Sequence, residues 1–481
     1  MIHSTLQSQK THPHPRWLTA ALVACLVVGV LRAALLVFHS PLIALANSYD
    51  EVRYTACFDL YPDRPADIPP TRNSPEAPFA YYRFLHNDQT MCYWSSELLF
   101  QGLVAGIYGV EHVLTGAERH SVRWIGALKF LALTAVWLTF TLAWLRRGAH
   151  AAALANGLLL PLLFADPANT IYLNTFYAEW TALLAAYALV GLLLLDLGQR
   201  PNRARETLLV LAAFLLATSK IQHLLLPLCC AALVFVFRFW RNRHWSWQGM
   251  SVLLGATLGL AVQVVQLGRD SDAIQAIDMF NRADVAFTGL LPNSSDPAAT
   301  AAELELDPGC LRYSGLRAWQ LPNYPGAVCP SLAHVTRGRE LAVLLREPGL
   351  TLRLGWHGLT ALEPWLAPGL GLVEGGDFTR LPNEFFTLSD ILTGVPVLRA
   401  IMLAGAPLAL LLLLPGGPHR RPLLLLYTAL TVAVMLATLT ITVLGDGLAD
   451  TPKQGHLVLN AALAWWIAAL VFAARRLLTR R

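Results

Sequence analysis

Two acidic side chains stand next to each other directly after the first apolar block of the chain. They are Asp50 and Glu51, in the segment 47–51 with the sequence NSYDE. A carboxylate beside a hydroxyl can take its proton, so the pair is a candidate for acid/base chemistry. The alternative interpretation is an acidic helix end in water. We therefore treat Asp50 and Glu51 as candidate catalytic residues.

A third carboxylate, Glu179, opens a later apolar block from the segment 174–180, NTFYAEW. A carboxylate in the first turn of a helix is also favoured by the helix dipole, which gives a purely structural alternative. The neighbouring Tyr172, Tyr177 and Trp180 are typical of the aromatic belt at a membrane surface. Glu179 joins the candidate catalytic residues.

The segment 218–223, TSKIQH, joins two apolar runs of roughly 12 to 15 residues, too short to cross a bilayer core of about 30 Å. The tip of this hairpin is therefore predicted to lie below the outer surface, within the protein. Ionisable groups at membrane depth are costly and usually functional, which points to Lys220 and His223, with Gln222 between them. A recessed ammonium suits the phosphate of a lipid head group. The alternative is a lysine that reaches up to the interface.

A similar set of residues lies between the last two apolar blocks, in the segment 445–456, GDGLADTPKQGH. Its glycines permit a tight turn, and Lys453 and His456 fall near the start of the final helix, where a phosphate is readily bound. A solvated loop before a proline-initiated helix is the alternative. Asp446 and Asp450 leave open a divalent cation, although nothing fixes a metal-ligand geometry.

The elements that position these residues are predicted to be membrane-spanning helices. Of the 481 residues, 55% are hydrophobic and 14% are charged, against about 25% charged in an ordinary soluble chain. The apolar residues form about ten blocks, most of them roughly the length that a bilayer core requires. We expect an all-α polytopic bundle with spans near 17–38, 124–145, 151–165, 177–197, 204–219, 224–237, 250–267, 395–414, 422–444 and 456–474.

Arginine clusters stand at the ends of these blocks. With both termini inside, every cluster lies on the cytoplasmic side, as the positive-inside rule requires. We therefore predict a bacterial inner membrane protein whose site faces the periplasm. The formal net charge of +5 reflects these clusters and does not indicate nucleic acid. Arg32 and Lys129, inside predicted spans, are interpreted as structural, either reaching the interface or paired with a buried acid.

Two long polar segments, 39–123 and 268–392, are then external. They divide the chain into an N-terminal transmembrane module (1–267), a long periplasmic region (268–392) and C-terminal transmembrane helices (393–481). Neither segment has the pattern of an independent domain, and the stretch 95–114 is amphipathic enough to lie on the membrane surface. In an oxidising compartment Cys57 is expected to pair with Cys92, and Cys310 with Cys329. Free thiols are the alternative.

Taken together, these segments resemble the GT-C class of glycosyltransferases, and within it the bacterial integral-membrane hexose transferases of surface-glycan biosynthesis. The resemblance is carried by the segments 48–51, 174–179, 219–223, 281–291, 296–297, 304–306 and 445–456. It implies transfer of a hexose from a polyprenyl-phosphate-linked donor to a glycan or lipid acceptor outside the cytoplasm.

The same resemblance implies roles for the candidate residues. Asp50 is expected to deprotonate the acceptor hydroxyl and Glu51 to position it, with Glu179 as the other candidate base. The residues expected to hold the departing phosphate are Lys220, His223, Lys453 and His456.

Two other functions share parts of this pattern. A glycan polymerase or ligase of the O-antigen type would use the same phosphate site together with an arginine-rich outer loop, and the region 268–392 carries Arg312, Arg317, Arg337, Arg339, Arg346 and Arg353. A transporter or flippase is disfavoured because the sequence shows no inverted repeat and no paired broken helices. The chain has no glycine-rich phosphate loop and no metal-ligand cluster with the required spacing.

Overall fold

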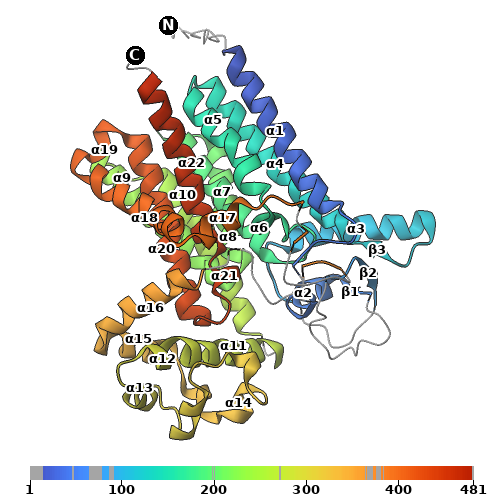
Figure 1. Ribbon diagram of the computed structural model, residues 1–481, viewed down its shortest axis with the longest axis vertical. Helices are drawn as coiled ribbons and strands as arrows, with labels where there is room; N and C mark the ends of the chain where they lie inside the picture. Colours follow the sequence, from blue (N-terminus) through green and yellow to red (C-terminus); the bar gives the residue numbers. More distant parts are fainter. Residues whose placement is uncertain are drawn as a thin grey trace.

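The computed structural model describes residues 15–45, 48–63, 78–85, 92–197, 199, 201–269, 272–362, 365, 372–374, 381–382 and 384–478, with only the backbone described at 48–50, 272–273 and 420. These residues form a helical bundle with an attached helical region at one end (Figure 1). The all-α polytopic fold class is confirmed.

Nine helices within the described part of the chain are long and apolar enough to cross a membrane. Their core joins side chains from nearly every span into one hydrophobic cluster. The nine are α1 (Arg16–Val37), α3 (Leu98–Thr115), α4 (Arg123–Arg146), α7 (Ala178–Leu195), η3 with α9 (Ile221–Asn242), α10 (Trp247–Leu267), α18 with its C-terminal extension (Pro396–His419), α20 (Pro422–Asp446) and α22 (His456–Leu478).

Each of the ten predicted spans coincides with a helical element, but two are not among the nine. One is α5 (His150–Leu159), which continues into the π-helical turn η2 (Leu160–Phe164), and the other is α8 (Arg203–Ser219). At 1.5 Å per residue, α8 is about 26 Å long, and charged residues fill its first turn. The ninth helix is instead α3, which corresponds to the predicted amphipathic stretch and projects sideways from the bundle in Figure 1.

Both ends of the described chain lie at the same end of the bundle, and the region α11–α16 lies at the other (Figure 1). This arrangement agrees with an even number of crossings and with one large polar region on the side opposite the termini. The two ends of the bundle are called here the terminal end and the outer end.

The first polar segment forms a small cap at the outer end rather than a loop. It contains α2 (Ser48–Thr55), a short turn η1 (Ala56–Phe58) and a three-stranded antiparallel sheet in the order β1-β2-β3. The strands are β1 (Leu60–Pro62), β2 (Tyr81–Phe84) and β3 (His120–Ser121), with Tyr61 opposite Arg83 and Tyr82 opposite His120. They are too short to show an alternating pattern, which is why the sequence did not predict them.

Much of the second polar segment packs around one hydrophobic core, which also includes Val443 of α20. Phe287, Leu304 and Leu332 are among the buried residues of this core. The turns between its short helices hide the pattern in the sequence. The helices are α11 (Asp272–Asp284), the π-helix η4 (Val285–Leu290), α12 (Leu291–Asn293), α13 (Pro297–Glu303), α14 (Pro325–Val328), α15 (Arg337–Arg346) and α16 (Pro348–Thr360), with 3-10 turns at 308–313, 318–320 and 330–334.

Three short elements complete the fold. They are α6 (Pro167–Thr170), which precedes α7, α17 (Leu388–Gly394), which leads into α18, and α21 (Thr451–Gln454), between α20 and α22. The division of the chain into 1–267, 268–392 and 393–481 stays a prediction.

Candidate functional site

Glu179 and Lys220 form a buried ion pair at the outer end of the bundle. Glu179 lies in the first turn of α7 and is 1% exposed, and the Lys220 ammonium donates to its Oε1 atom. Lys220 Nζ also lies 3.4 Å from the Gln454 side-chain oxygen. The pair therefore joins α7, the hairpin after α8 and the short helix α21, which are far apart in the sequence.

The hairpin tip that carries Lys220 is partly to fully buried, but the length of its two helical limbs is not the reason. α8 has 17 residues and Ile221–Asn242 has 22, so the predicted limbs of 12 to 15 residues were too short. The tip is covered instead by the segment before α3, where Ser95 Oγ donates to the Ser219 carbonyl at 2.7 Å. His223 Nδ1 lies 2.8 Å from Ser219 Oγ. The hairpin tip is thus buried by packing of the segment before α3. The length of the two limbs alone does not predict this burial.

The segment 445–456 folds back over the same site. Gly447 has φ +61°, and a Cβ atom there would lie 2.3 Å from the Asp284 carbonyl oxygen, so only glycine fits this close approach. Leu448 N–H donates to Thr288 Oγ1 at 2.8 Å. These contacts dock the segment on α11 and η4. Gln222 packs against the same turn, its Cγ atom 3.6 Å from a Cβ placed on Gly445.

Lys453 and His456 are buried beside Glu179. The Lys453 ammonium lies 4.5 Å from the centre of the Tyr177 ring and 3.5 Å from Asp450 Oδ2. His456 Nε2 lies 3.2 Å from the Glu179 backbone carbonyl, and its Nδ1 lies 3.0 Å from the Lys453 carbonyl. The predicted cations thus gather around one carboxylate, each already in contact with a protein group.

Glu51 lies on the other side of the segment that leads into α7. Its carboxylate accepts hydrogen bonds from the Tyr82 hydroxyl at 2.5 Å and from the Phe176 N–H at 3.4 Å. Phe176 is followed directly by Tyr177, whose ring contacts Lys453. Glu51 and the Glu179 cluster are therefore linked through one short piece of backbone. Asp50 lies in α2, but its side chain is outside the described part of the structure.

A second buried ion pair lies beneath this backbone piece, and its acid, Glu97, was not named from the sequence. Lys129 of α4 is fully buried, 2.7 Å from Oε1 of the fully buried Glu97. The same ammonium donates to the carbonyls of Thr175 at 2.8 Å and Tyr177 at 3.3 Å. Thr181 of α7 donates to the other Glu97 oxygen. The expected buried acid for Lys129 is thus Glu97, just before α3.

The other intramembrane cation, Arg32, has the structural role that was predicted. Its guanidinium lies 3.7 Å from the buried Asp166 carboxylate and donates to backbone carbonyls of Pro161 and Phe386. It fixes α1 against η2 and takes no part in the site.

Several buried polar atoms at the site lack a hydrogen-bond partner among the described residues. They are Oε2 of Glu179, the Tyr172 hydroxyl and Oγ1 of Thr451. The Tyr172 ring lies 5.9 Å from that of His456, and burial, followed by the Glu179 charge, raises the pKa of its phenol well above the usual value. The phenol therefore stays protonated. Buried polar groups are nearly always hydrogen-bonded, so these atoms are available to a bound substrate.

Asp284, at the C-terminal end of α11, contributes a further acid beside Asp446 and Asp450. It is 2% exposed and accepts the Ala318 N–H at 2.7 Å. Burial, together with the Asp450 charge, raises the pKa of Asp284 to about 7. The π-helical turn η4 follows it, and such turns are frequent at functional sites.

The raised pKa of Asp284 predicts a pH dependence of stability. Between the unfolded pKa, about 4, and about 7, the folded state keeps a proton that the unfolded state has released, so stability falls as pH rises through this window and is flat above it. Asp284→Asn should remove this slope while keeping the bond from Ala318. Thermal unfolding of the purified protein between pH 4.5 and pH 8 measures it. Asp307→Asn, at an exposed position, is the control, and an equal slope in both variants would contradict the assignment.

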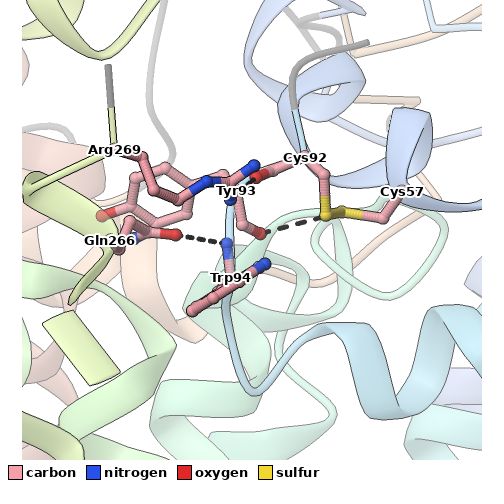
Figure 2. The surroundings of a disulfide bond; sticks show 6 residues. All are labelled: Cys57, Cys92, Tyr93, Trp94, Gln266 and Arg269. Carbon is pink, nitrogen blue, oxygen red and sulfur yellow. Dashed lines mark hydrogen bonds between the residues drawn. A yellow bond between two sulfur atoms is a disulfide. The ribbon is translucent and has the colours of Figure 1, made fainter. Parts of the chain in front are cut away.

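Both predicted cysteine pairs, Cys57 with Cys92 and Cys310 with Cys329, are disulfides in the structure. Figure 2 shows the surroundings of the first. Next to it, Tyr93 N–H donates to the Arg53 carbonyl of α2 at 2.8 Å, and Arg269 donates to the Cys92 carbonyl at 2.9 Å. The bond thus holds the helix that carries Asp50 and Glu51 against the segment that leads to Glu97.

Removing the Cys57–Cys92 bond should destabilise the protein and lower its activity. The bond joins residues 35 apart, and a loop of this length predicts a loss of about 2–4 kcal/mol for Cys57→Ser/Cys92→Ser. Thermal unfolding with and without reductant measures the effect. Cys229→Ser, which replaces a free thiol, should behave as wild type. Equal unfolding temperatures for the two variants would show that the bond contributes nothing.

Within the described residues, no group of three or more His, Cys, Asp or Glu side chains is placed to hold a metal ion. The structure therefore gives no support to a cation held by Asp446 and Asp450. The predicted candidates that it brings together are Glu179, Lys220, Gln222, His223, Asp446, Asp450, Lys453 and His456.

The model of one protein family, the YfdI N-terminal transmembrane domain, matches residues 6–324. The chain belongs to this family. The matched part includes Glu51, Glu97, Glu179, Lys220 and His223, and it ends before the segment 445–456 that covers them. This membership supports the resemblance to GT-C membrane glycosyltransferases, and it confirms a multi-pass membrane protein.

Other comparisons add little. The crystal structure of the oligosaccharyltransferase from Archaeoglobus fulgidus, tethered with an acceptor peptide by a disulfide bond, is similar with a TM-score of 0.38 and 15% identity. The similarity covers 93% of this chain and 49% of that one, so the chain spans about half the length of that enzyme. A similarity this distant carries no conclusion about activity. No curated protein matches the sequence.

Proposed function

We propose that the protein is a membrane glycosyltransferase that moves a hexose from a polyprenyl-phosphate-linked donor to a glycan or lipid acceptor. The observation that carries the proposal is the buried cluster of Glu179, Lys220, Lys453 and His456 at the outer end of the bundle. Family membership supports the same class of reaction. An anionic lipid phosphate is the ligand that two buried ammonium groups at this depth suit best.

We propose that residues on the two sides of the segment 174–179 carry out different parts of the reaction. On one side, Asp50 accepts the proton of the acceptor hydroxyl as it attacks the sugar carbon, and Glu51 positions that hydroxyl. On the other side, Lys220 and Lys453 stabilise the phosphate that departs with the electron pair of the broken C–O bond. Glu179 holds the Lys220 ammonium in place, and its unpartnered oxygen Oε2 is positioned for a sugar hydroxyl or for the base role.

The proposed orientation follows from the arginine clusters. The arginine clusters at the terminal end of the bundle favour the cytoplasmic side for that end. The Glu179 cluster, at the outer end, is therefore proposed to face the periplasm of a bacterial inner membrane. An oxidising outer compartment agrees with the two disulfides.

The experiment that tests the proposal compares surface glycan in cells that carry the wild-type chain, Asp50→Asn or Glu51→Gln. Removing a general base costs roughly 100-fold or more in rate, so at least one variant should lose the hexose from the glycan while remaining in the membrane at wild-type level. Asp307→Asn, far from the segment 174–179 in the sequence and exposed, is the control. Full hexose content in both site variants would refute the base assignment.

The polymerase or ligase alternative gains nothing from the structure. Four of the six loop arginines are paired with acids of the same region, as Arg339 is with Glu305 at 2.5 Å and Arg337 with Glu340 at 2.8 Å. Arg346 likewise contacts Glu303, and Arg353 contacts Glu347. These arginines stabilise the outer region rather than gather around a ligand.

A further inference from the structure

A large apolar cavity lies within the bundle, separate from the cluster around Glu179. It has a volume of about 860 Å³ and lies between α5, η2, α7, α18, α20 and α22. Ligand pockets of proteins typically measure about 300–1,000 Å³, so the cavity is large enough for a ligand. Its wall is mostly leucine, alanine and aromatic side chains.

Paired polar groups lie along the cavity. Near its end toward the outer site, Asn460 and Asn169 exchange two hydrogen bonds, of 2.7 and 3.0 Å, and Asn460 also donates to the His456 carbonyl at 2.9 Å. Further along the cavity, Asn156 accepts the Tyr187 hydroxyl at 2.7 Å. These side chains of the wall are thus already paired with protein groups, and the rest of the lining is left to an apolar ligand.

The mouth of the cavity lies at the terminal end of the bundle. The lining residues there are the exposed ones, Leu412, Arg421, Ala473 and Arg476, whereas Leu163, Leu457 and Asn460 at the other end are buried. The cavity therefore opens at Arg421, at the start of α20, and Arg476, near the end of α22. Apolar lining residues lie next to both arginines.

The cavity is somewhat longer than one leaflet. Along α22 its lining residues run from Leu457 to Arg476, a distance of about 28 Å at 1.5 Å per residue. One leaflet with its head-group layer measures about 20–22 Å. A single acyl chain with its head group at the arginines therefore fits within the cavity.

We propose that this cavity binds an acyl chain of an anionic phospholipid drawn from the leaflet at the terminal end, with the lipid phosphate held by Arg421 and Arg476. Guanidinium groups bind phosphate by two parallel hydrogen bonds, and basic side chains near a membrane surface favour anionic lipids. The lipid fills the space between α7, α20 and α22, the three helices whose outer ends carry Glu179, Asp446 and His456. The proposal does not rest on the proposed function.

Native mass spectrometry of the purified protein with equal amounts of phosphatidylglycerol and phosphatidylcholine tests the proposal. The wild type should retain phosphatidylglycerol about tenfold more, and Arg421→Gln/Arg476→Gln should bring the ratio close to one. Ala464→Trp, which fills the cavity, should reduce retention of phosphatidylglycerol about tenfold. The controls are Arg475→Gln and Leu470→Trp, at exposed positions that do not line the cavity, and both should match the wild type.

Three results would each overturn the proposal. One is equal lipid retention by Ala464→Trp and Leu470→Trp. Another is an unchanged lipid ratio in the double arginine variant, which replaces exposed side chains only and is therefore expected to fold. The third is displacement of phosphatidylglycerol by an equal amount of polyprenyl phosphate, which would assign the cavity to the carrier lipid instead.

Discussion

Replacing Lys220 with methionine is expected to abolish hexose transfer and to destabilise the protein by about 3–5 kcal/mol. The substitution leaves the Glu179 carboxylate charged, 1% exposed and without its closest cation, and breaking one side of a buried ion pair has this cost. Thermal unfolding of the purified protein and hexose content of the surface glycan measure the two effects. Arg282→Met is the control, because its pair with Asp278 is partly exposed and should be worth less than about 1 kcal/mol.

The double variant Glu179→Gln/Lys220→Met separates a functional pair from a structural one. Both charges are then gone, so most of the lost stability should return, whereas transfer should stay absent because the phosphate contact is still missing. If the double variant regains both stability and transfer, the pair serves only the fold and the site assignment fails.

The second large effect is expected for Lys129→Met. This variant leaves Glu97 fully buried without its cation, and it leaves the carbonyls of Thr175 and Tyr177 without their donor. We therefore expect the protein to lose about 3–5 kcal/mol of folding stability. Because Lys129 holds the backbone between Glu51 and Glu179, the fraction that remains folded should show a lower kcat with little change in KM. Kinetics at a temperature where the variant is folded measure this split.

A matched variant again distinguishes positioning from folding. In Glu97→Gln/Lys129→Met the charges are removed together, but the two carbonyls still lack their donor, so stability should recover more than kcat does. Thr134→Ala, whose hydroxyl bonds only within its own helix α4, is the control and should leave kcat unchanged. Recovery of wild-type kcat in the double variant would limit Lys129 to a structural role.

The membrane spans could be predicted from the sequence because hydrophobic length and arginine position are local properties. Each predicted span coincides with a helix, and the span 204–219 differs from α8 by a single residue. The small sheet β1-β2-β3 could not be predicted, because its strands have two to four residues and form only through pairing between distant segments.

The site could be predicted in part for a related reason. Lys220 was found because a cation between apolar runs is conspicuous on its own, and Lys453 and His456 because they stand near the start of the final helix. Glu97 was missed because it stands in a stretch that reads as amphipathic, and only its contact with Lys129 in α4 shows that it is buried. Asp284 was missed as a site residue because its burial depends on docking of the segment that contains Gly447.

Binding of polyprenyl phosphate to the purified protein tests the central claim most directly, since it needs neither the sugar nor the acceptor. The comparison is between the wild type and Glu179→Gln/Lys220→Met, which carry the same net charge, so any difference reports the Lys220 contact rather than general attraction. A charge-assisted hydrogen bond is worth about 1.5–3 kcal/mol, which predicts binding weaker by roughly tenfold to a hundredfold in the variant. Equal affinity of the two proteins would contradict a phosphate site at Lys220.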